Sequence, residues 1–338
     1  MKAVQIQQFG TPDVLQVVTL PEPEPAPGEI LIKVESASVN YSDIARRSNA
    51  TYPFPTPLPF IPGSEVAGTV AALGAGVEGL PIGTPVFALA GQGSNGYAQY
   101  VTTPASQVIP IPPGVSMDQA AGLPVAGTSA LMLLREVAHL QPGESVFIPA
   151  AAGGLGCYAV QLAKVLGAGL VIGGTSSPAK FDKVRSFGAD HVVDYTQSAW
   201  VAQVRELTGG QGVNVMLEMN GGALFTQSVQ CLAPFGRLVV YGMASGQALT
   251  LDADLVKFFF YEPSLNQSIH VFNLGLQFGL RPQVAAQAMA DFIGYVASGH
   301  VKVAVDTVLP LAQAAEAHRL VESRRSTGKI ILKPWLEA

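Results

Sequence analysis

The chain has 338 residues, of which 49% are hydrophobic and 13% charged, and a length of this kind predicts two domains rather than one core. The formal net charge of −5, without basic runs or an uninterrupted apolar stretch of membrane length, argues against nucleic-acid partners and membrane spans. With two cysteines and a strand-like amino terminus we expect neither a disulfide framework nor a signal region, and we expect a cytoplasmic protein.

The first part of the chain predicts a barrel-like β domain. Short strand-like runs alternate with turns rich in Gly and Pro, at 15–20, 29–35, 65–73, 85–89, 97–102 and 108–111. Several short strands at such spacing are typical of a small closed sheet. The composition changes near residue 116, and we place the first domain boundary near Gly122.

The second part alternates strands with helices. We predict strands at 145–150, 169–174, 191–193, 213–218 and 236–242, and helices at 155–166, 178–187, 199–207 and 222–231. This alternation is typical of a doubly wound α/β domain with a parallel sheet. Beyond it we predict helices at 283–298 and 311–323 and strands at 304–308 and 329–332, packed back on the first domain. The predicted domains are therefore 1–122 with 273–338, and 123–272.

A glycine-rich turn joins the first predicted strand of the second domain to its helix. Read from Ala151, the turn is G-x-G-x-x-G with alanine in place of the first glycine, and it keeps Gly153 and Gly156. In that fingerprint the glycines allow a close approach of the backbone to a pyrophosphate at the helix amino terminus. The alternative is a turn made tight only for packing, but the order of strand, turn, helix and strand favours the dinucleotide interpretation.

The end of the next strand bears on the choice of cofactor. An NAD site usually carries Asp or Glu there to bind the ribose 2′-hydroxyl, whereas this chain has Thr175, Ser176, Ser177 and Lys180. A 2′-phosphate meets no repulsion and finds a cation, so the segment favours NADPH. Ser177 can also cap a helix that begins at Pro178, with Lys180 a solvated residue of its first turn, and both interpretations can hold together.

Several motifs resemble one known family. They are 39–43 (VNYSD), 58–68 (LPFIPGSEVAG), 143–156 with Gln161 and Lys164, 187–195 (FGADHVVDY) and 236–242 (GRLVVYG). The chain is similar, over nearly its whole length, to the zinc-independent quinone oxidoreductases of the medium-chain dehydrogenase/reductase superfamily, which include the zeta-crystallins. The resemblance implies a GroES-like β-barrel catalytic domain and a Rossmann domain, with NADPH in the cleft between them and a homodimer formed through Rossmann edge strands.

The departures from the zinc enzymes of that superfamily are informative. Asn40 stands where they carry a catalytic Cys, and Ser64 in Gly63-Ser64-Glu65 stands where they carry a His. The four structural cysteines are absent and the five histidines are scattered. We therefore expect no metal, and hydrogen-bond donors in its place.

The resemblance also implies roles for single residues. It places Asn40, Tyr41, Ser42 and Asp43 at the nicotinamide and its ribose, with Thr128 near the same end. It places Gly153, Gly154, Leu155 and Gly156 at the pyrophosphate, Ser176, Lys180 and Tyr195 at the 2′-phosphate, and Asn220, Gly242, Met243 and Ala244 along the cofactor. Arg324 matches a phosphate-binding arginine, although Arg325 leaves the register open. Asn40 and Asp43 could instead form a turn, and Tyr195 could be a half-buried aromatic at a strand end.

Tyr52 is the candidate catalytic residue, together with Asn40. It matches a tyrosine that related enoyl reductases present to the substrate carbonyl, where a phenol can donate a hydrogen bond or proton to a developing enolate. The alternative is an aromatic lid over the cleft. His270 falls where the family's loop meets the nicotinamide. A lone His at such a place is more often an incidental pocket residue than an acid.

These patterns predict an NADPH-dependent reductase that transfers hydride to a small apolar quinone or α,β-unsaturated carbonyl compound. Two alternatives remain: an enoyl-thioester (enoyl-CoA) reductase, and a non-catalytic NADPH-binding structural or redox-sensing protein. The loops at 49–57 and 269–276 are expected to set the substrate. The apolar run 258–261 is a candidate dimer surface.

Overall fold

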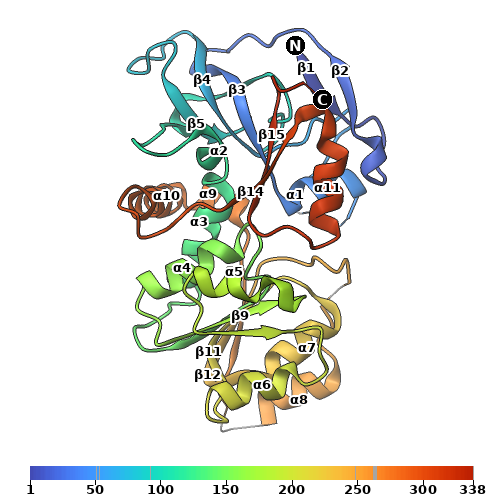
Figure 1. The fold of residues 1–338 in the computed structure, drawn as a ribbon, viewed down its shortest axis with the longest axis vertical. Coiled ribbons are helices and arrows are strands. Elements are labelled where there is room, and N and C mark those ends of the chain that lie inside the picture. The colour runs from blue at the N-terminus through green and yellow to red at the C-terminus, as the bar shows by residue number, and fades with distance from the viewer. Residues whose placement is uncertain (51, 53, 92, 248, 262–264, 338) are drawn as a thin grey trace. The chain divides into compact units, whose positions relative to one another are not determined.

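The computed structural model describes residues 1–50, 52, 54–91, 93–247, 249–261 and 265–337. The chain divides into two compact units, one formed by residues 1–126 with 303–338 and one by residues 127–302 (Figure 1). Among the helices that are described, none has the length and apolar character needed to cross a membrane.

The first unit is built on a seven-stranded, mostly antiparallel sheet. Its strands are β3 (Glu29–Val39), β4 (Glu65–Leu73), β5 (Pro85–Leu89), β6 (Tyr100–Pro104), β7 (Val108–Pro110), β14 (Val305–Pro310) and β15 (Lys329–Lys333). The sheet order is β14-β15-β3-β4-β5-β7, and β6 pairs with β3. A separate ribbon joins β1 (Lys2–Gln5) to β2 (Gln16–Thr19). The inner faces enclose an aliphatic core with Ile30, Ile32 and Val66 at its centre, each fully buried.

Three helices accompany this sheet: α1 (Tyr41–Ser48), α2 (Met117–Ala120) and α11 (Ala314–Glu322). α1 follows β3 directly. Its amino terminus is fixed by Asp43, whose Oδ2 accepts a hydrogen bond of 2.9 Å from the N–H of Asn40. Asn49 ends the helix in the left-handed region with φ 58°, a conformation that Asn tolerates better than most residues.

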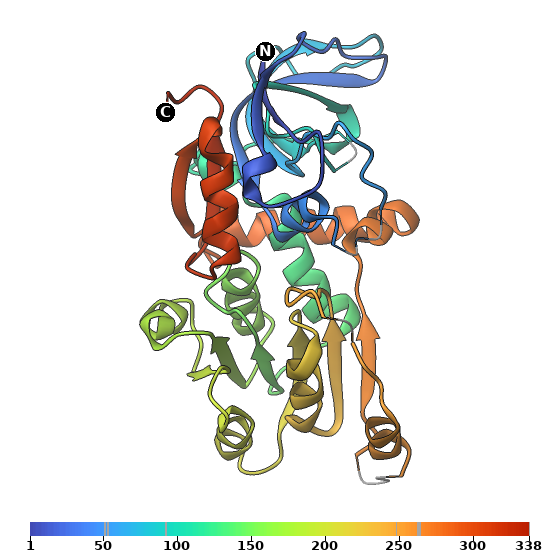
Figure 2. The same ribbon diagram turned by 90° about the vertical axis from the view of Figure 1, so that its right-hand side faces the viewer.

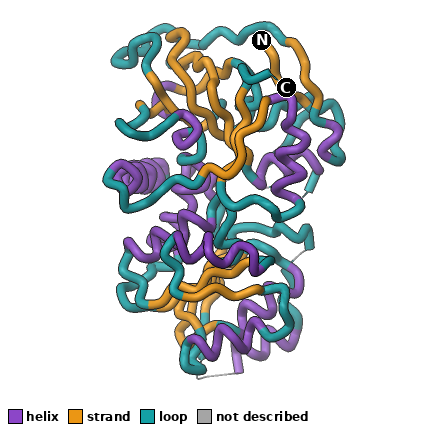
Figure 3. The backbone as a smooth tube through the Cα atoms, in the orientation of Figure 1, coloured by secondary structure: helices purple, strands orange, loops and turns teal. Residues whose placement is uncertain are grey.

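The second unit has a six-stranded parallel sheet. Its strands are β8 (Ser145–Ile148), β9 (Leu170–Thr175), β10 (His191–Asp194), β11 (Val213–Glu218), β12 (Leu232–Val240) and β13 (Ser268–Val271), in the order β10-β9-β8-β11-β12-β13. The helices are α3 (Pro124–Met132), α4 (Gly156–Val165), α5 (Phe181–Ser186), α6 (Trp200–Leu207), α7 (Gly222–Gln230), α8 (Ala253–Tyr261), α9 (Leu274–Leu280) and α10 (Pro282–Ala297). α4 packs on β8 and β9, and α7 on β11 and β12. Figure 2 shows helices flanking these parallel strands, and Figure 3 shows the strands of each unit gathered together.

The sequence predicted that the second unit ends at residue 272. In the structure it ends at Lys302. The reason is α10. Its Phe292 is fully buried, its ring lies 5.2 Å from that of Tyr158 on α4, and its ring atoms occupy the place where Gly127 lacks a Cβ. Asp291 on the same helix pairs with Arg135. These contacts join α10 to the second unit. The first boundary lies after Ala126, a few residues beyond the predicted position near Gly122.

Candidate active site

The turn between β8 and α4 has the geometry that the fingerprint requires. A Cβ on Gly156 would lie 2.2 Å from the carbonyl oxygen of Ala150, so no other residue fits there without a shift of the backbone. Gly153 donates a hydrogen bond of 2.7 Å to that same oxygen. Ala150 itself has φ 46°, which shows how sharply the chain turns from strand to helix.

The turn leaves hydrogen-bond donors available at the amino terminus of α4. Neither the N–H of Gly154 nor that of Leu155 has an acceptor within the part of the chain that the structure describes. Both N–H groups precede a helix of 10 residues, whose amino terminus carries the positive end of the helix dipole. This combination fits the pyrophosphate of a dinucleotide.

The parallel sheet brings most of the predicted cofactor residues of this unit to one edge. Because all six strands run in the same direction, their carboxyl ends and the turns after them lie together. These turns carry Gly153 to Gly156 after β8, Ser176 and Lys180 after β9, Tyr195 after β10, Asn220 after β11, and Gly242, Met243 and Ala244 after β12.

The turn after β9 contains no carboxylate. Ser177 accepts a hydrogen bond from the N–H of Ala179, and Pro178 begins a short 3-10 helix that leads into α5. The capping interpretation of Ser177 is therefore confirmed, and Ser176 and Lys180 stay partly exposed beside it. Tyr195 is 6% exposed and belongs to a core cluster with Phe147 and Trp200, so its ring is a core aromatic and its contact with a phosphate stays a prediction.

Among the described residues of this unit, four buried side-chain oxygens have no hydrogen-bond partner, and two of them belong to predicted cofactor residues: Oγ1 of Thr128 and Oδ1 of Asn220. Such atoms are costly unless a ligand or water completes them. The backbone at Asn220 is held by Glu218, whose Oε1 accepts hydrogen bonds of 2.6 and 2.8 Å from the N–H groups of Asn220 and Gly221. Burial raises the pKa of Glu218. Glu218 is not among the residues predicted from the sequence, although an acidic residue that ends an apolar strand is a visible signal.

The first unit contains a buried polar network around Asn40. Nζ of Lys329 donates hydrogen bonds of 2.8 Å to Oδ1 of Asn40 and 2.9 Å to Oε1 of Glu65. Nδ2 of Asn40 donates to that same carboxylate oxygen at 2.9 Å. The N–H of Val125 donates to Oε2 of Glu65 at 2.7 Å. Lys329 and Glu65 are 2% and 0% exposed, so this ion pair is isolated from water.

The network fixes the orientation of the Asn40 amide. An ammonium group can only donate and an ionised carboxylate can only accept, so Oδ1 must face Lys329 and Nδ2 must face Glu65. A flipped amide would set donor against donor and acceptor against acceptor. Within the described residues, no group of three His, Cys, Asp or Glu side chains could hold a metal ion.

Asp43 lies next to this network and is buried. Its Oδ1 accepts hydrogen bonds from the N–H of Gly63 at 3.0 Å and from Oγ of Ser64 at 3.4 Å. Burial raises its pKa to about 6, against the opposing effect of these backbone bonds. Asp43 is therefore a cap of α1 that also fixes the Gly63 turn, rather than part of an isolated turn.

A second buried chain links the barrel to α11. The hydroxyl of Tyr97 and Nε2 of His318 lie 3.1 Å apart, and both side chains are fully buried. Burial and, to a lesser extent, nearby Arg47 lower the pKa of His318 to about 3. Arg47 is itself buried and pairs with Glu322. None of these residues could be predicted as a cluster from the sequence, because they come together only when α11 packs on the sheet.

Arg324 follows α11 with φ 55° and lies close enough to Tyr41 to lower the pKa of that phenol, which burial raises. Arg325 is exposed and interacts with Ser323 and Glu316. The neighbourhood of Tyr41 thus favours Arg324 over Arg325 as the arginine near the predicted nicotinamide residues of this unit.

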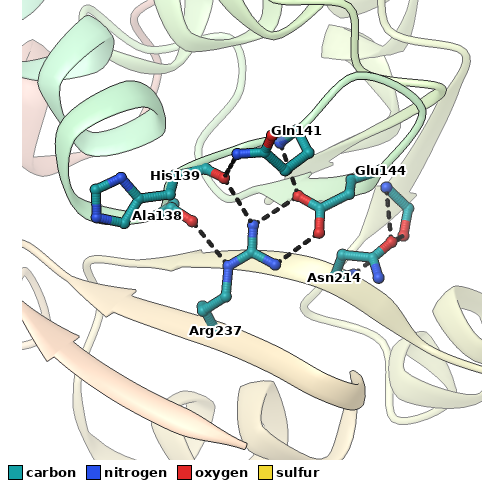
Figure 4. A network of polar contacts seen from close by, with 7 residues as sticks. Ala138, His139, Gln141, Glu144, Asn214 and Arg237 are labelled. Carbon is teal, nitrogen blue, oxygen red and sulfur yellow. Dashed lines mark hydrogen bonds and ion pairs between the residues drawn. The ribbon is translucent and has the colours of Figure 1, made fainter.

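The other end of the parallel sheet is structural. Arg237 on β12 donates two hydrogen bonds to the carboxylate of Glu144 and one to the carbonyl of Ala138, as Figure 4 shows. Oδ1 of Asn214, which Figure 4 labels beside Glu144, accepts hydrogen bonds from the N–H and the hydroxyl of Ser145. A depression of about 420 Å³ lies here at the amino ends of the strands, opposite the edge that carries the predicted cofactor residues.

Comparison with known proteins agrees with this geometry. Residues 26–113 match the model of the alcohol dehydrogenase GroES-like domain, and residues 187–332 match that of the zinc-binding dehydrogenase family. A quinone oxidoreductase of Pseudomonas aeruginosa is 33% identical over 334 residues, which cover 98% of this chain and 99% of that protein. The chain belongs to the quinone oxidoreductase family of the medium-chain dehydrogenase/reductase superfamily.

Solved members of this family have the same fold. The Escherichia coli quinone oxidoreductase, solved with NADPH, is 29% identical with a TM-score of 0.89 and covers 99% of this chain and 100% of its own. A mycobacterial protein, also solved with NADPH, is 34% identical with a TM-score of 0.88 at the same coverage. The prediction that this chain combines a GroES-like domain with a Rossmann-type domain is confirmed.

Proposed function

We propose that the protein is an NADPH-dependent oxidoreductase that transfers hydride to a quinone or an α,β-unsaturated carbonyl compound without zinc. The observation that carries the cofactor assignment is the turn after β9, which offers Ser176 and Lys180 and no carboxylate. A 2′-phosphate is accepted there by charge and hydroxyl groups, where an NAD site would carry an acid. The two relatives solved with NADPH support this choice.

The residues present fit this cofactor. The unbonded N–H groups before α4 suit a pyrophosphate, and the unpartnered oxygens of Thr128 and Asn220 suit a polar ligand. Bound NADPH supplies the hydride from C4 of its nicotinamide. We assign its binding to Asn40, Tyr41, Asp43, Thr128, Gly153, Gly154, Leu155, Gly156, Ser176, Lys180, Tyr195, Asn220, Gly242, Met243, Ala244 and Arg324.

We propose that the Asn40 network stands in for the metal of the zinc dehydrogenases. A positive charge, the Lys329 ammonium, is already bound to Glu65 and to Oδ1 of Asn40. This charge holds Nδ2 of Asn40 as a fixed donor, and a donor fixed in advance costs no reorganisation when charge develops on a neighbouring oxygen. Polarisation of the acceptor then falls to hydrogen bonds.

We propose Tyr52 as the proton or hydrogen-bond donor to the oxygen of an enone. Burial raises the pKa of its phenol, while Arg46 lowers it, so the hydroxyl keeps its proton at neutral pH and can donate it. Replacement by Phe should lower turnover on enals or enones by about one to two powers of ten. Quinones should respond less, because their reduction gives an aromatic hydroquinone anion. Equal losses on both classes, matched by Phe54→Ala, would make Tyr52 a wall of the pocket.

The assignment is tested by NADPH oxidation with a panel of quinones, enals, enones and enoyl thioesters. We expect turnover with quinones or with enals and enones. Turnover confined to enoyl thioesters would favour an enoyl-thioester reductase. Tight binding of NADPH without oxidation by any acceptor would select a non-catalytic NADPH-binding protein.

We also propose a homodimer formed through β13, an edge strand of the parallel sheet. Val271 on this strand is 77% exposed, and Leu276 and Leu280 on the following α9 are 52% and 78% exposed. An apolar edge strand with open backbone groups is a ready template for pairing with a second copy. Three of the four side chains in the predicted run 258–261 lie outside the described residues, and the fourth, Phe259, is partly buried against the core.

A further inference from the structure

Arg46 on α1 is a buried arginine whose hydrogen-bond partners among the described residues are all uncharged. It is 8% exposed. Its Nε donates to Oγ1 of Thr56 at 3.1 Å, and its terminal nitrogens donate to the carbonyls of Gly93 at 3.0 Å and Pro55 at 3.4 Å. It forms no ion pair with any carboxylate in the described parts of the chain, whereas its neighbour Arg47 pairs with Glu322.

Two aromatic rings also contact the Arg46 guanidinium. Its Cζ lies 4.2 Å from the ring centroid of Phe60 and 5.6 Å from that of Tyr52. The Tyr52 ring in turn meets Phe54 edge to face at 6.0 Å. Arg46 therefore connects α1 to the loop that carries Tyr52, and the planar guanidinium fits this arrangement better than a lysine ammonium would.

The positive charge is costly where it stands. Burial lowers the pKa of Arg46, and the nearby Tyr52 and Asp43 oppose this only in part, since no carboxylate of the described residues is close enough for an ion pair and a buried cation is disfavoured by its loss of hydration. Its position near the carboxyl end of α1 offers partial compensation through the helix dipole. The helix dipole does not explain why Arg46 is buried, because an exposed arginine at the same end of α1 would interact with the dipole equally well. The guanidinium beside Tyr52 therefore keeps a positive charge that no ion pair among the described residues neutralises, and this charge attracts an incoming anion.

We propose that Arg46 is a specificity-determining residue that makes the acceptor site at Tyr52 prefer acceptors carrying an anionic substituent on an apolar ring or enone. This inference rests on the proposed reductase function and deepens it. The aromatic residues around Arg46 contact the apolar body of the acceptor, and the guanidinium supplies the missing half of an ion pair. An acid group on the acceptor is bound through charge, so the preference depends on the substituent and not on the reacting carbonyl.

The test compares 1,4-naphthoquinone with 1,4-naphthoquinone-2-sulfonate as acceptors. In the wild type and in Arg46→Gln, kcat/KM is measured for both, and the ratio between the proteins cancels the intrinsic reactivity of each quinone. We expect Arg46→Gln to lose the preference for the sulfonate by roughly tenfold, the effect of one charge-assisted contact, while the neutral quinone changes little. Arg46→Lys should keep most of the preference, because it keeps the charge. Arg319→Gln, at an exposed arginine of the same unit, controls for net charge.

Two results would overturn the proposal: an unchanged ratio in Arg46→Gln, or equal loss on both quinones, which would make Arg46 a support of the loop only. A binding measurement on the wild type stands independently of variant folding and of turnover. With NADPH present, 2-naphthoate should raise the melting temperature more than its neutral amide, 2-naphthamide. Equal shifts would contradict the preference for an anion. A larger shift with naphthoate in a protein that oxidises no NADPH would support the preference while contradicting the reductase assignment, so the two can fail separately.

Discussion

The orientation of the Asn40 amide depends on one ammonium group. Lys329 and Glu65 lie far apart in the sequence, on β15 and at the start of β4, and β3 brings them together because it pairs with both strands. From the sequence, Asn40 and Ser64 could be recognised as replacements for metal ligands. Lys329 could not be linked to them, because a lysine in a carboxyl-terminal strand is ordinarily a surface residue.

This network makes a prediction about stability. Lys329→Met leaves the Glu65 carboxylate buried without its counter-ion, and we expect a loss of about 3 to 5 kcal/mol in the free energy of unfolding. The double variant Lys329→Met with Glu65→Gln removes both charges and should recover most of that loss. Urea unfolding of the wild type and both variants measures this. A double variant as unstable as the single one would show that the uncompensated charge is not the cause.

Lys180 carries the prediction about cofactor choice. Lys180→Ala should weaken NADPH binding by roughly 10- to 100-fold and leave NADH binding nearly unchanged, because only NADPH carries the 2′-phosphate. Fluorescence titration with both cofactors is the measurement. Equal losses for the two would rule out a role at the 2′-phosphate. Lys183→Ala, one turn further along α5, is a matched control.

At the scale of elements, the sequence predicted most strands and helices because their patterns are local. The fingerprint turn was recognised from Gly153 and Gly156, and the structure supplies the reason in the close approach to Ala150. β13 and α9 were expected only as a substrate loop, since a four-residue strand such as Ser268–Val271 has no periodicity of its own and forms by pairing with β12. α10 was predicted as a helix but assigned to the other domain, because only its packing on α3 and α4 decides its place.

The contact of α11 with the barrel predicts a pH dependence. His318 is neutral in the native state because its pKa is lowered to about 3, whereas in the unfolded chain it takes up a proton below about 6.5. Its contribution to stability is therefore present above that value and is lost as the pH falls. Asp43, with a pKa raised to about 6, has the opposite effect, since its contribution is present at low pH and is lost as the pH rises through 6.

The variant His318→Gln isolates the first effect, because Asp43 is unchanged in it. Between pH 6 and pH 4 the wild type should lose about 1.4 kcal/mol per pH unit relative to the variant. Urea unfolding at several pH values gives the difference. A difference independent of pH would mean that His318 is not held neutral in the folded protein.

At the scale of the whole molecule, the proposed dimer is open to a direct test. Val271→Lys places a charge on the exposed edge strand β13, and charged side chains are a common means of blocking such edges. We expect a shift from dimer to monomer in light scattering coupled to size exclusion. Ile82→Lys, at a residue of the first unit that is 68% exposed, is the matched control and should leave the dimer intact. A dimer that survives Val271→Lys would contradict pairing through β13.

The central claim is that hydride transfer proceeds with a fixed amide and a buried ammonium where related dehydrogenases use zinc. Metal analysis of the purified protein, combined with NADPH oxidation before and after treatment with a chelator, tests it most directly. We expect no stoichiometric zinc and an unchanged rate, because Asn40, Glu65 and Lys329 already satisfy one another. One zinc ion per chain, with activity lost on its removal and restored on its return, would contradict it.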